Sequence, residues 1–175
     1  MLKQFGLVIA VILAIIAIRA GMHTDSFHVE RSITIRASAQ KTFALVNDFR
    51  NFGRWSPWES LDPKMQRTIS GPTSGPGAVY EWDGNRKAGA GRMEIVEATP
   101  PARIVVRIDF LRPIASTSVI EYSFQPIGDS TKVTWAMDGP SPFISKVMQV
   151  FVSMDKMIGG DFQRGLTGLK ALAEQ

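Results

Sequence analysis

The order of apolar patterns after Phe27 constrains the fold of this chain more than any other feature. An alternating segment comes first, a short helical segment follows, six more alternating segments fill the middle, and a long helical segment ends the chain. Because each strand must bury one face, this order predicts strands that curl into a cup whose concave face is closed by the last helix. A cup of this kind typically encloses space for an apolar molecule.

Turn residues, not helices, separate most of the alternating segments. The predicted strands are 28–36, 64–70, 78–83, 92–98, 103–110, 116–125 and 131–138. The glycine-rich segments 71–77 and 84–91 look like phosphate-binding loops, but a P-loop needs Gly-Lys-Ser/Thr at the start of a helix, and both segments precede strands. We therefore predict that both are hairpin turns.

Alternation with period two sorts the strand side chains into two faces. The apolar face holds Tyr80, Trp82, Met93, Ile95, Ile104, Val106, Ile108, Phe110, Ile120, Tyr122, Phe124, Val133, Trp135 and Met137. The opposite face holds Glu81, Asp83, Arg92, Glu94, Arg103, Arg107, Asp109, Glu121 and Lys132. Cross-strand ion pairs in solvent explain these charges without a catalytic role.

Two tyrosines are the best polar candidates on the apolar face. The hydroxyls of Tyr80 and Tyr122 can hydrogen-bond a ligand carbonyl in an apolar cavity, and Trp82 and Trp135 add surface and an N–H donor. The alternative is that all four side chains only fill the core. An acid or base that works in a cavity needs burial to shift its pKa towards neutrality, and the pattern places few ionisable groups inside.

Helical patterns flank the strands. Ser38 is a good N-cap for a short helix over residues 39–47. The aromatic segment 48–59 contains Trp55 and Trp58, which either gate a cavity mouth, dip into a membrane interface or pack beneath the short helices; we favour packing.

The C-terminal pattern has two parts, 141–158 and 161–174. The pair Gly159-Gly160 lies between them and either kinks one long helix or separates two, with Asp161 able to cap the second. Met157, Phe162 and Leu166 lie among the apolar residues of this pattern. Its methionines suit an adaptable apolar surface, although plain core packing explains them as well.

The N-terminus carries a different signal. Residues 5–18 form an uncharged apolar run between Lys3 and Arg19, the layout of a membrane anchor or of a signal segment. Because Arg19 fits poorly beside a cleavage site, we favour an uncleaved single-pass anchor over residues 1–22, with membrane contact through 2–22. Residues 23–27 would be a tether. Lys3 favours export of the following domain to the periplasmic side, whereas Arg19 and Arg31 oppose it.

Composition limits the partners. The chain has 175 residues, a net charge of +4 and no cysteine, which suits one domain over residues 28–175 and excludes disulfides and thiolate ligands. Lys and Arg are scattered, so we expect no nucleic-acid partner.

His28 and Glu30 share one face of the first strand, but two ligands do not make a metal site and an ion pair explains them. We expect no metal and no cofactor, and the pattern leaves the oligomeric state open.

Several sequence segments resemble one known family. HVERSITI, WSPWES, AVYEWDGN, GRMEIVEATP, TKVTWAMDG, the terminal DKMIGGDFQRGLTGLKALAE and the pair Asp62-Pro63 look like the polyketide cyclase/dehydrase and lipid-transport group. This group belongs to the SRPBCC or START-like superfamily, and the chain resembles bacterial members with an N-terminal hydrophobic segment. The resemblance covers roughly His28 to the end. It implies an α+β helix-grip fold, with an antiparallel sheet of about seven strands wrapped around a long C-terminal helix and an apolar cavity between them.

The resemblance leaves the activity open, because members of the group bind lipids, sterols, quinones or hormones and a minority cyclise polyketides. We favour binding or carriage of a hydrophobic small molecule, lipid-like, quinone-like or polyketide-like, by a membrane-tethered domain. A polyketide cyclase or aromatase-type enzyme is the alternative, although no catalytic constellation is visible, and a pocketless protein-interaction module is a third. The predicted cavity lining is Tyr80, Trp82, Met93, Ile108, Phe110, Tyr122, Phe124, Trp135, Met137, Met157, Phe162 and Leu166.

Overall fold

The structure is a computed structural model that describes residues 2–175, with side chains described from Gln4 onward. Its elements follow the predicted order. They are α1 (Leu2–Gly21), β1 (Ser26–Ile35), α2 (Ala39–Val46), the 3-10 helices η1 (Phe49–Arg54) and η2 (Pro57–Ser60), β2 (Gln66–Ser70), β3 (Val79–Asp83), β4 (Ala90–Thr99), β5 (Arg103–Arg112), β6 (Ser116–Ile127), β7 (Ser130–Pro140), α3 (Phe143–Gln149) and α4 (Met154–Ala173).

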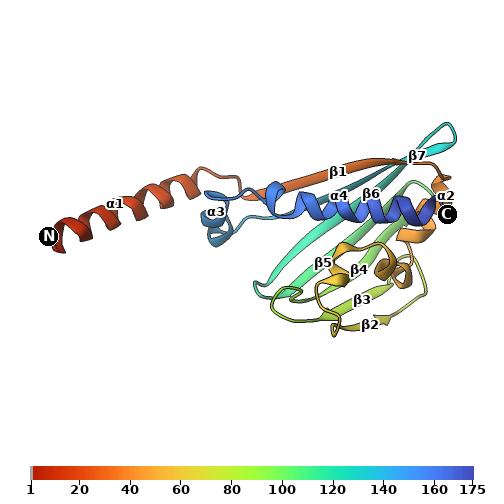
Figure 1. Ribbon diagram of the computed structural model, residues 1–175, viewed down its shortest axis with the longest axis horizontal. Helices are drawn as coiled ribbons and strands as arrows, with labels where there is room; N and C mark the ends of the chain where they lie inside the picture. Colours follow the sequence, from red (N-terminus) through yellow and green to blue (C-terminus); the bar gives the residue numbers. More distant parts are fainter. Residues whose placement is uncertain (1) are drawn as a thin grey trace.

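The seven strands form one open antiparallel sheet in the order β1-β7-β6-β5-β4-β3-β2. Helix α4 contacts β1 and β7 as well as α2, η1 and η2, so it lies against the sheet together with the segment that precedes β2. Figure 1 shows α4 running along the sheet while α1 projects from the domain at the opposite end from the C-terminus. The predicted α+β fold, with a sheet closed by the C-terminal helix, is confirmed.

The predicted division into two sheet faces is also confirmed. Most of the predicted inward-facing side chains are buried, and Trp82 and Phe110 are partly buried against the same core. The outer face carries ion pairs between neighbouring residues and strands, such as Arg92 with Glu94 at 2.8 Å and Arg103 with Glu121 at 2.7 Å. Because these pairs are solvent-accessible, they keep the outer face soluble and contribute little to the fold.

The first half of the domain follows the predicted caps. Ser38 accepts a hydrogen bond from the Lys41 amide at 3.2 Å and starts α2. The aromatic segment that follows packs instead of extending outward: Phe49, Phe52 and Trp55 are buried, and the Trp55 ring lies 5.7 Å from the Trp135 ring. Strand β1 starts at Ser26, two residues before the predicted start, because Ser26 and Phe27 pair with Pro140 and Gly139 of β7.

The C-terminal helices divide at a different place from the one that the glycine pair suggests. Helix α3 ends at Gln149, and α4 begins at Met154 after Ser153, whose hydroxyl accepts from the Lys156 amide at 3.3 Å. Helix α4 then continues through Gly159 and Gly160 without a break. Asp161 therefore does not cap a helix; it lies inside α4 and pairs with Arg164.

A specific contact explains the glycine at position 159. The Arg31 guanidinium of β1 lies where a side chain at Gly159 would be, and it donates to the Asp155 carboxylate of α4 at 2.7 Å. The glycine thus makes room for a cation that ties α4 to the sheet, instead of bending the helix.

The strand register places several connections at one end of the sheet, here called the α1 end. Strand β1 begins there, β7 ends there, and the turns β3–β4 (residues 84–89) and β5–β6 (residues 113–115) lie there, because neighbouring strands pair antiparallel. Helix α3 follows directly from β7 at this end and contacts α1. Helix α2 and the turn after β6 lie at the opposite end.

Helix α4 approaches the segment before β2 so closely that Gly168 leaves no room for a side chain. A Cβ atom at Gly168 would lie 2.6 Å from the Trp55 carbonyl oxygen, whereas one at Gly160 would meet nothing nearer than the Arg164 guanidinium at 3.7 Å. We expect Gly168→Ala to lower the free energy of unfolding by about 1–3 kcal/mol, although alanine is the better helix former.

The matched variant Gly160→Ala tests whether the contact with Trp55 causes the loss of stability. Its Cβ is unobstructed, so the helix propensity should act alone and raise stability by about 0.5–1 kcal/mol. Thermal unfolding of both full-length variants, followed by near-ultraviolet circular dichroism of the tryptophans, measures the difference. Equal stabilisation by the two alanines would show that α4 is not pressed against Trp55.

Candidate functional site

A cavity of about 370 Å³ lies between the sheet and α4. Its volume falls within the range of small-molecule sites in proteins. The third alternative from the sequence, a module without a pocket, therefore does not describe this protein. The residues that line it are Phe27, Phe52, Trp58, Glu59, Met65, Tyr80, Trp82, Lys87, Ala88, Met93, Ile108, Phe110, Arg112, Pro113, Ile114, Ser116, Ser118, Ile120, Trp135, Met137, Pro140, Pro142, Ser145, Met148, Met154, Met157, Ile158 and Phe162.

The cavity occupies only the half of the sheet nearest the α1 end. Along β6, Ser118 and Ile120 line it, but the next inward-facing residue, Tyr122, does not. The other half is filled by α2 and the aromatic segment after it. Phe43 of α2 packs on Phe124 at 5.5 Å between ring centroids, and Trp55 packs on Tyr122 at 6.3 Å.

An aromatic cluster separates the cavity from the filled half. The Trp135 ring stacks on Phe162 of α4 with centroids 4.4 Å apart, and the Trp58 ring meets both at an edge, 5.5 Å from Trp135 and 6.1 Å from Phe162. Each of these three residues lines the cavity. Stacked and edge-on rings hold one another in a fixed arrangement, so this wall is preformed before any ligand arrives.

The predicted lining residues divide according to their depth along the strands. Those that line the cavity are Tyr80, Trp82, Met93, Ile108, Phe110, Trp135, Met137, Met157 and Phe162. The other three predicted residues, Tyr122, Phe124 and Leu166, are not among the residues that line it. These three point to the interior but lie beyond the aromatic cluster, where the core is packed.

The sequence reasoning missed a polar cluster in the cavity wall. Glu59 of η2 accepts a hydrogen bond from the Tyr80 hydroxyl through one carboxylate oxygen and from the Arg67 guanidinium, at 2.5 Å, through the other. The Glu59 side chain is 12% exposed and lines the cavity, and Arg67 also donates to the Met65 carbonyl at 2.8 Å. An acidic residue within the aromatic segment WSPWES was the available signal.

This cluster fixes the protonation state of the tyrosine. Burial raises the pKa of Tyr80, and the hydrogen bond to the Glu59 carboxylate raises it further. The phenol therefore stays protonated even at a pH where a free tyrosine ionises, and it donates a hydrogen bond to the Glu59 carboxylate. Its oxygen keeps the capacity to accept a hydrogen bond from a ligand.

The two tryptophan N–H groups proposed as ligand donors differ. The Trp82 indole donates to the Ala88 carbonyl at 3.1 Å, so its N–H is engaged within the protein. The Trp135 indole N–H is buried and has no hydrogen-bond partner among the described residues. A buried donor without a partner is uncommon in folded proteins.

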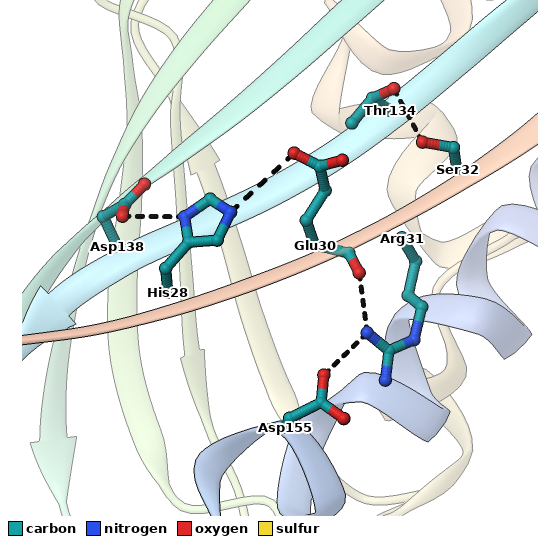
Figure 2. A network of polar contacts seen from close by, with 7 residues as sticks. All are labelled: His28, Glu30, Arg31, Ser32, Thr134, Asp138 and Asp155. Atoms are coloured by element: carbon teal, nitrogen blue, oxygen red, sulfur yellow. Dashed lines mark hydrogen bonds and ion pairs between the residues drawn. The ribbon is translucent and has the colours of Figure 1, made fainter.

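The pair His28 and Glu30 lies away from the cavity. Figure 2 shows both on the strand face opposite to Arg31, which turns towards α4. His28 Nδ1 lies 2.8 Å from Asp138 of β7 and Nε2 lies 3.7 Å from Glu30. The hydrogen bond with Asp138 raises the pKa of His28, as expected of an ion pair on an exposed strand. No group of three or more metal-ligating side chains suited to a metal ion is found within the described residues.

With this geometry described, the chain can be compared with known proteins. The sequence model of the family described as "Polyketide cyclase / dehydrase and lipid transport" matches residues 26–174, so the chain belongs to this family. No curated protein matches the chain.

Solved structures share the fold at low sequence identity. A Chromobacterium violaceum protein has a TM-score of 0.59 at 13% identity, with 86% of this chain and 98% of that chain covered. A Rhizobium loti protein has a TM-score of 0.56 at 22% identity, covering 85% and 99%. The di-domain aromatase/cyclase BexL of the BE-7585A biosynthetic pathway has a TM-score of 0.65 at 14% identity; 90% of this chain but 53% of that chain is covered.

The helix outside the domain has the length and composition of a membrane span. Residues Gln4–Gly21 of α1 have a mean hydropathy of 2.2, and little of this segment is buried. One apolar helix near the N-terminus is compatible with a single-pass anchor or with a signal sequence.

The polar cluster predicts different effects for the two buried tyrosines. Tyr80→Phe leaves one Glu59 oxygen without its donor, which should cost about 1–3 kcal/mol of unfolding free energy. Tyr122→Phe should change stability by less than about 0.5 kcal/mol, because burial alone raises the pKa of Tyr122 and no hydrogen bond contributes. Thermal unfolding of both variants measures this. Equal losses would mean that the Tyr80–Glu59 hydrogen bond does not hold the wall.

Proposed function

We propose that this protein binds or carries a hydrophobic small molecule in the cavity between the sheet and α4, as a domain tethered to a membrane by α1. The observation that carries the proposal is a preformed cavity with a mainly apolar wall. Methionines from both layers, such as Met93, Met137 and Met157, line it and can adapt to cargo of variable shape.

The charge balance of the wall points to neutral cargo in the inner part of the cavity. Glu59 is the acidic residue of the lining, and its carboxylate is matched by Arg67 and Tyr80. A charged ligand group placed beside this neutralised cluster would lose water without gaining a free counter-charge. The lining cations Lys87 and Arg112 lie at the α1 end instead, next to the turns. Lipid-like, quinone-like and polyketide-like molecules all fit a largely apolar cavity with few polar contacts.

A cyclase or aromatase-type activity is the second candidate, and one observation favours it. Glu59 and Tyr80 place a carboxylate and a phenol side by side on the wall of an apolar cavity, where a keto compound would meet them. Both carboxylate oxygens already accept hydrogen bonds, one of them from a guanidinium. A general base must reach the substrate proton at hydrogen-bond distance, whereas both donors hold this carboxylate in the wall, so we prefer binding over catalysis.

The proposed membrane tether is helix α1. A helix of this hydropathy whose apolar side chains are exposed is stable in a bilayer and costly in water. We propose that it stays attached as a single-pass anchor and that the domain lies on the exported, periplasmic side. Protease accessibility of the domain in intact cells tests the side of the membrane.

A change in cavity volume tests the binding function. Ile108 lines the cavity from β5, and Ile108→Trp adds a large ring to the space that the cargo would use. We expect this variant to fold and to lose binding of an uncharged lipophilic fluorescent probe, N-phenyl-1-naphthylamine, by about tenfold or more, since even a few lost apolar contacts cost over 1.4 kcal/mol.

Val119→Trp is the matched control. Val119 lies on the neighbouring strand β6 but on the outer face, where it is 46% exposed. This variant should bind the probe like the unaltered protein. Loss of binding in both variants, or in neither, would contradict a binding site between the sheet and α4.

A further inference from the structure

The α1 end of the domain carries an apolar surface that the core does not explain. Helix α3, the segment after it, and the end of β5 with the β5–β6 turn expose large apolar side chains: Phe151 is 69% exposed, Leu111 62% and Phe143 60%. Folding buries such residues where it can, and a cluster of them at one end of a domain marks a contact surface. We call this surface the apolar rim; its residues are Leu111, Ile114, Phe143, Ile144, Phe151 and Val152.

The rim surrounds the entrance to the cavity. Ile114 of the β5–β6 turn belongs both to the rim and to the cavity lining. Pro142 and Met148 line the cavity from the α3 side, next to Phe143 and within one turn of Phe151. A molecule that enters or leaves at the α1 end therefore passes between the two parts of the rim.

The rim is held close to α1 by the chain itself. Residues 22–25 separate α1 from β1, so the start of the sheet lies at most about 18 Å from the end of α1. Two further contacts fasten α3 to this short segment: Lys146 pairs with Asp25 at 2.5 Å, and the Ser141 amide donates to the Asp25 carbonyl at 2.7 Å. Helix α3 also contacts α1 directly.

The charges at this end suit a lipid surface that carries negative charge. Arg86 and Lys87 are exposed in the β3–β4 turn, and Arg19 lies near the end of α1. The acidic neighbours are engaged, since Asp83 pairs with Arg112 and Asp25 with Lys146. Exposed cations beside exposed apolar side chains are the combination that binds an anionic leaflet and inserts into its interface.

We propose that the apolar rim docks into the same membrane leaflet that α1 enters, so that the cavity opens onto lipid and not onto water. This inference rests on the proposed function, because it takes α1 as the membrane helix. With α1 in the bilayer, the short connection brings the rim within reach of the interface, and docking covers exposed apolar surface that the fold leaves in water. Hydrophobic cargo then exchanges between the leaflet and the cavity without crossing water.

Depth-dependent quenching on the full chain tests the docking. The chain has no cysteine, so single cysteines accept one fluorophore each. We would place a nitrobenzoxadiazole label at Ile144→Cys or Phe151→Cys on the rim, and at Ile127→Cys at the end of β6 as a matched exposed apolar control at the opposite end of the domain. A fourth label at Ile9→Cys reports the insertion of α1. The chains are reconstituted into vesicles of phosphatidylglycerol and phosphatidylcholine, with or without brominated acyl chains.

We expect the rim labels to shift to shorter wavelength and to lose about half of their intensity with brominated lipid, because an interfacial element sits about 5–10 Å into the headgroup and acyl boundary. The label at position 127 should not respond. Unquenched rim labels with a quenched label at position 9 would overturn the docking and leave the anchor intact. Unquenched labels at all positions would overturn both. A wavelength shift at the rim without quenching by brominated lipid would show that protein, such as a second copy, covers the rim, and would also overturn the docking.

Discussion

The stacking of Trp135 on Phe162 is the contact on which the interior depends. It joins the middle of β7 to α4, and its ring spacing of 4.4 Å is possible because Gly165 of α4 has no side chain; a Cβ there would lie 2.7 Å from the Trp135 ring. On one side of this contact the interior is filled by α2 and the aromatic segment after it. On the other side the sheet and α4 enclose the cavity. One aromatic contact thus fixes both how closely the helix lies against the sheet and where the empty space begins.

The polar cluster depends on the same arrangement. The segment that places Trp58 against Trp135 also places the next residue, Glu59, on the cavity wall, where Arg67 of β2 and Tyr80 of β3 meet it. A buried carboxylate is stable only when its charge is matched, and here a guanidinium and a phenol match it. The cavity therefore combines a mainly apolar lining with one neutralised polar position, a combination that orients cargo without requiring it to carry charge.

Much of this fold is predictable from the sequence, because the constraints are local. Alternation assigned strand residues such as Tyr80, Ile108 and Trp135 to the inner face, and Ser38 marked the start of α2. The extent of the cavity along the strands, in contrast, depends on contacts between residues that are distant in sequence. Tyr122 has the same inward direction as Ile120, yet it lies in the packed core because Trp55, far away in sequence, covers it. Similarly, the pair Gly159-Gly160 suggests a kink or a break when only the local sequence is considered. Its actual cause is distant in sequence, because Arg31 of β1 occupies the space beside Gly159. Alternation predicts the face of a residue, but long-range packing decides whether that face is filled.

The central claim is that the cavity holds a hydrophobic molecule. Native mass spectrometry of the full chain, released from mild detergent after purification from its own host and followed by mass analysis of the organic extract, tests it most directly. We predict one bound apolar molecule per chain, lost in Ile108→Trp. A chain that is consistently empty, with no apolar compound enriched in the extract relative to Ile108→Trp, would contradict the claim.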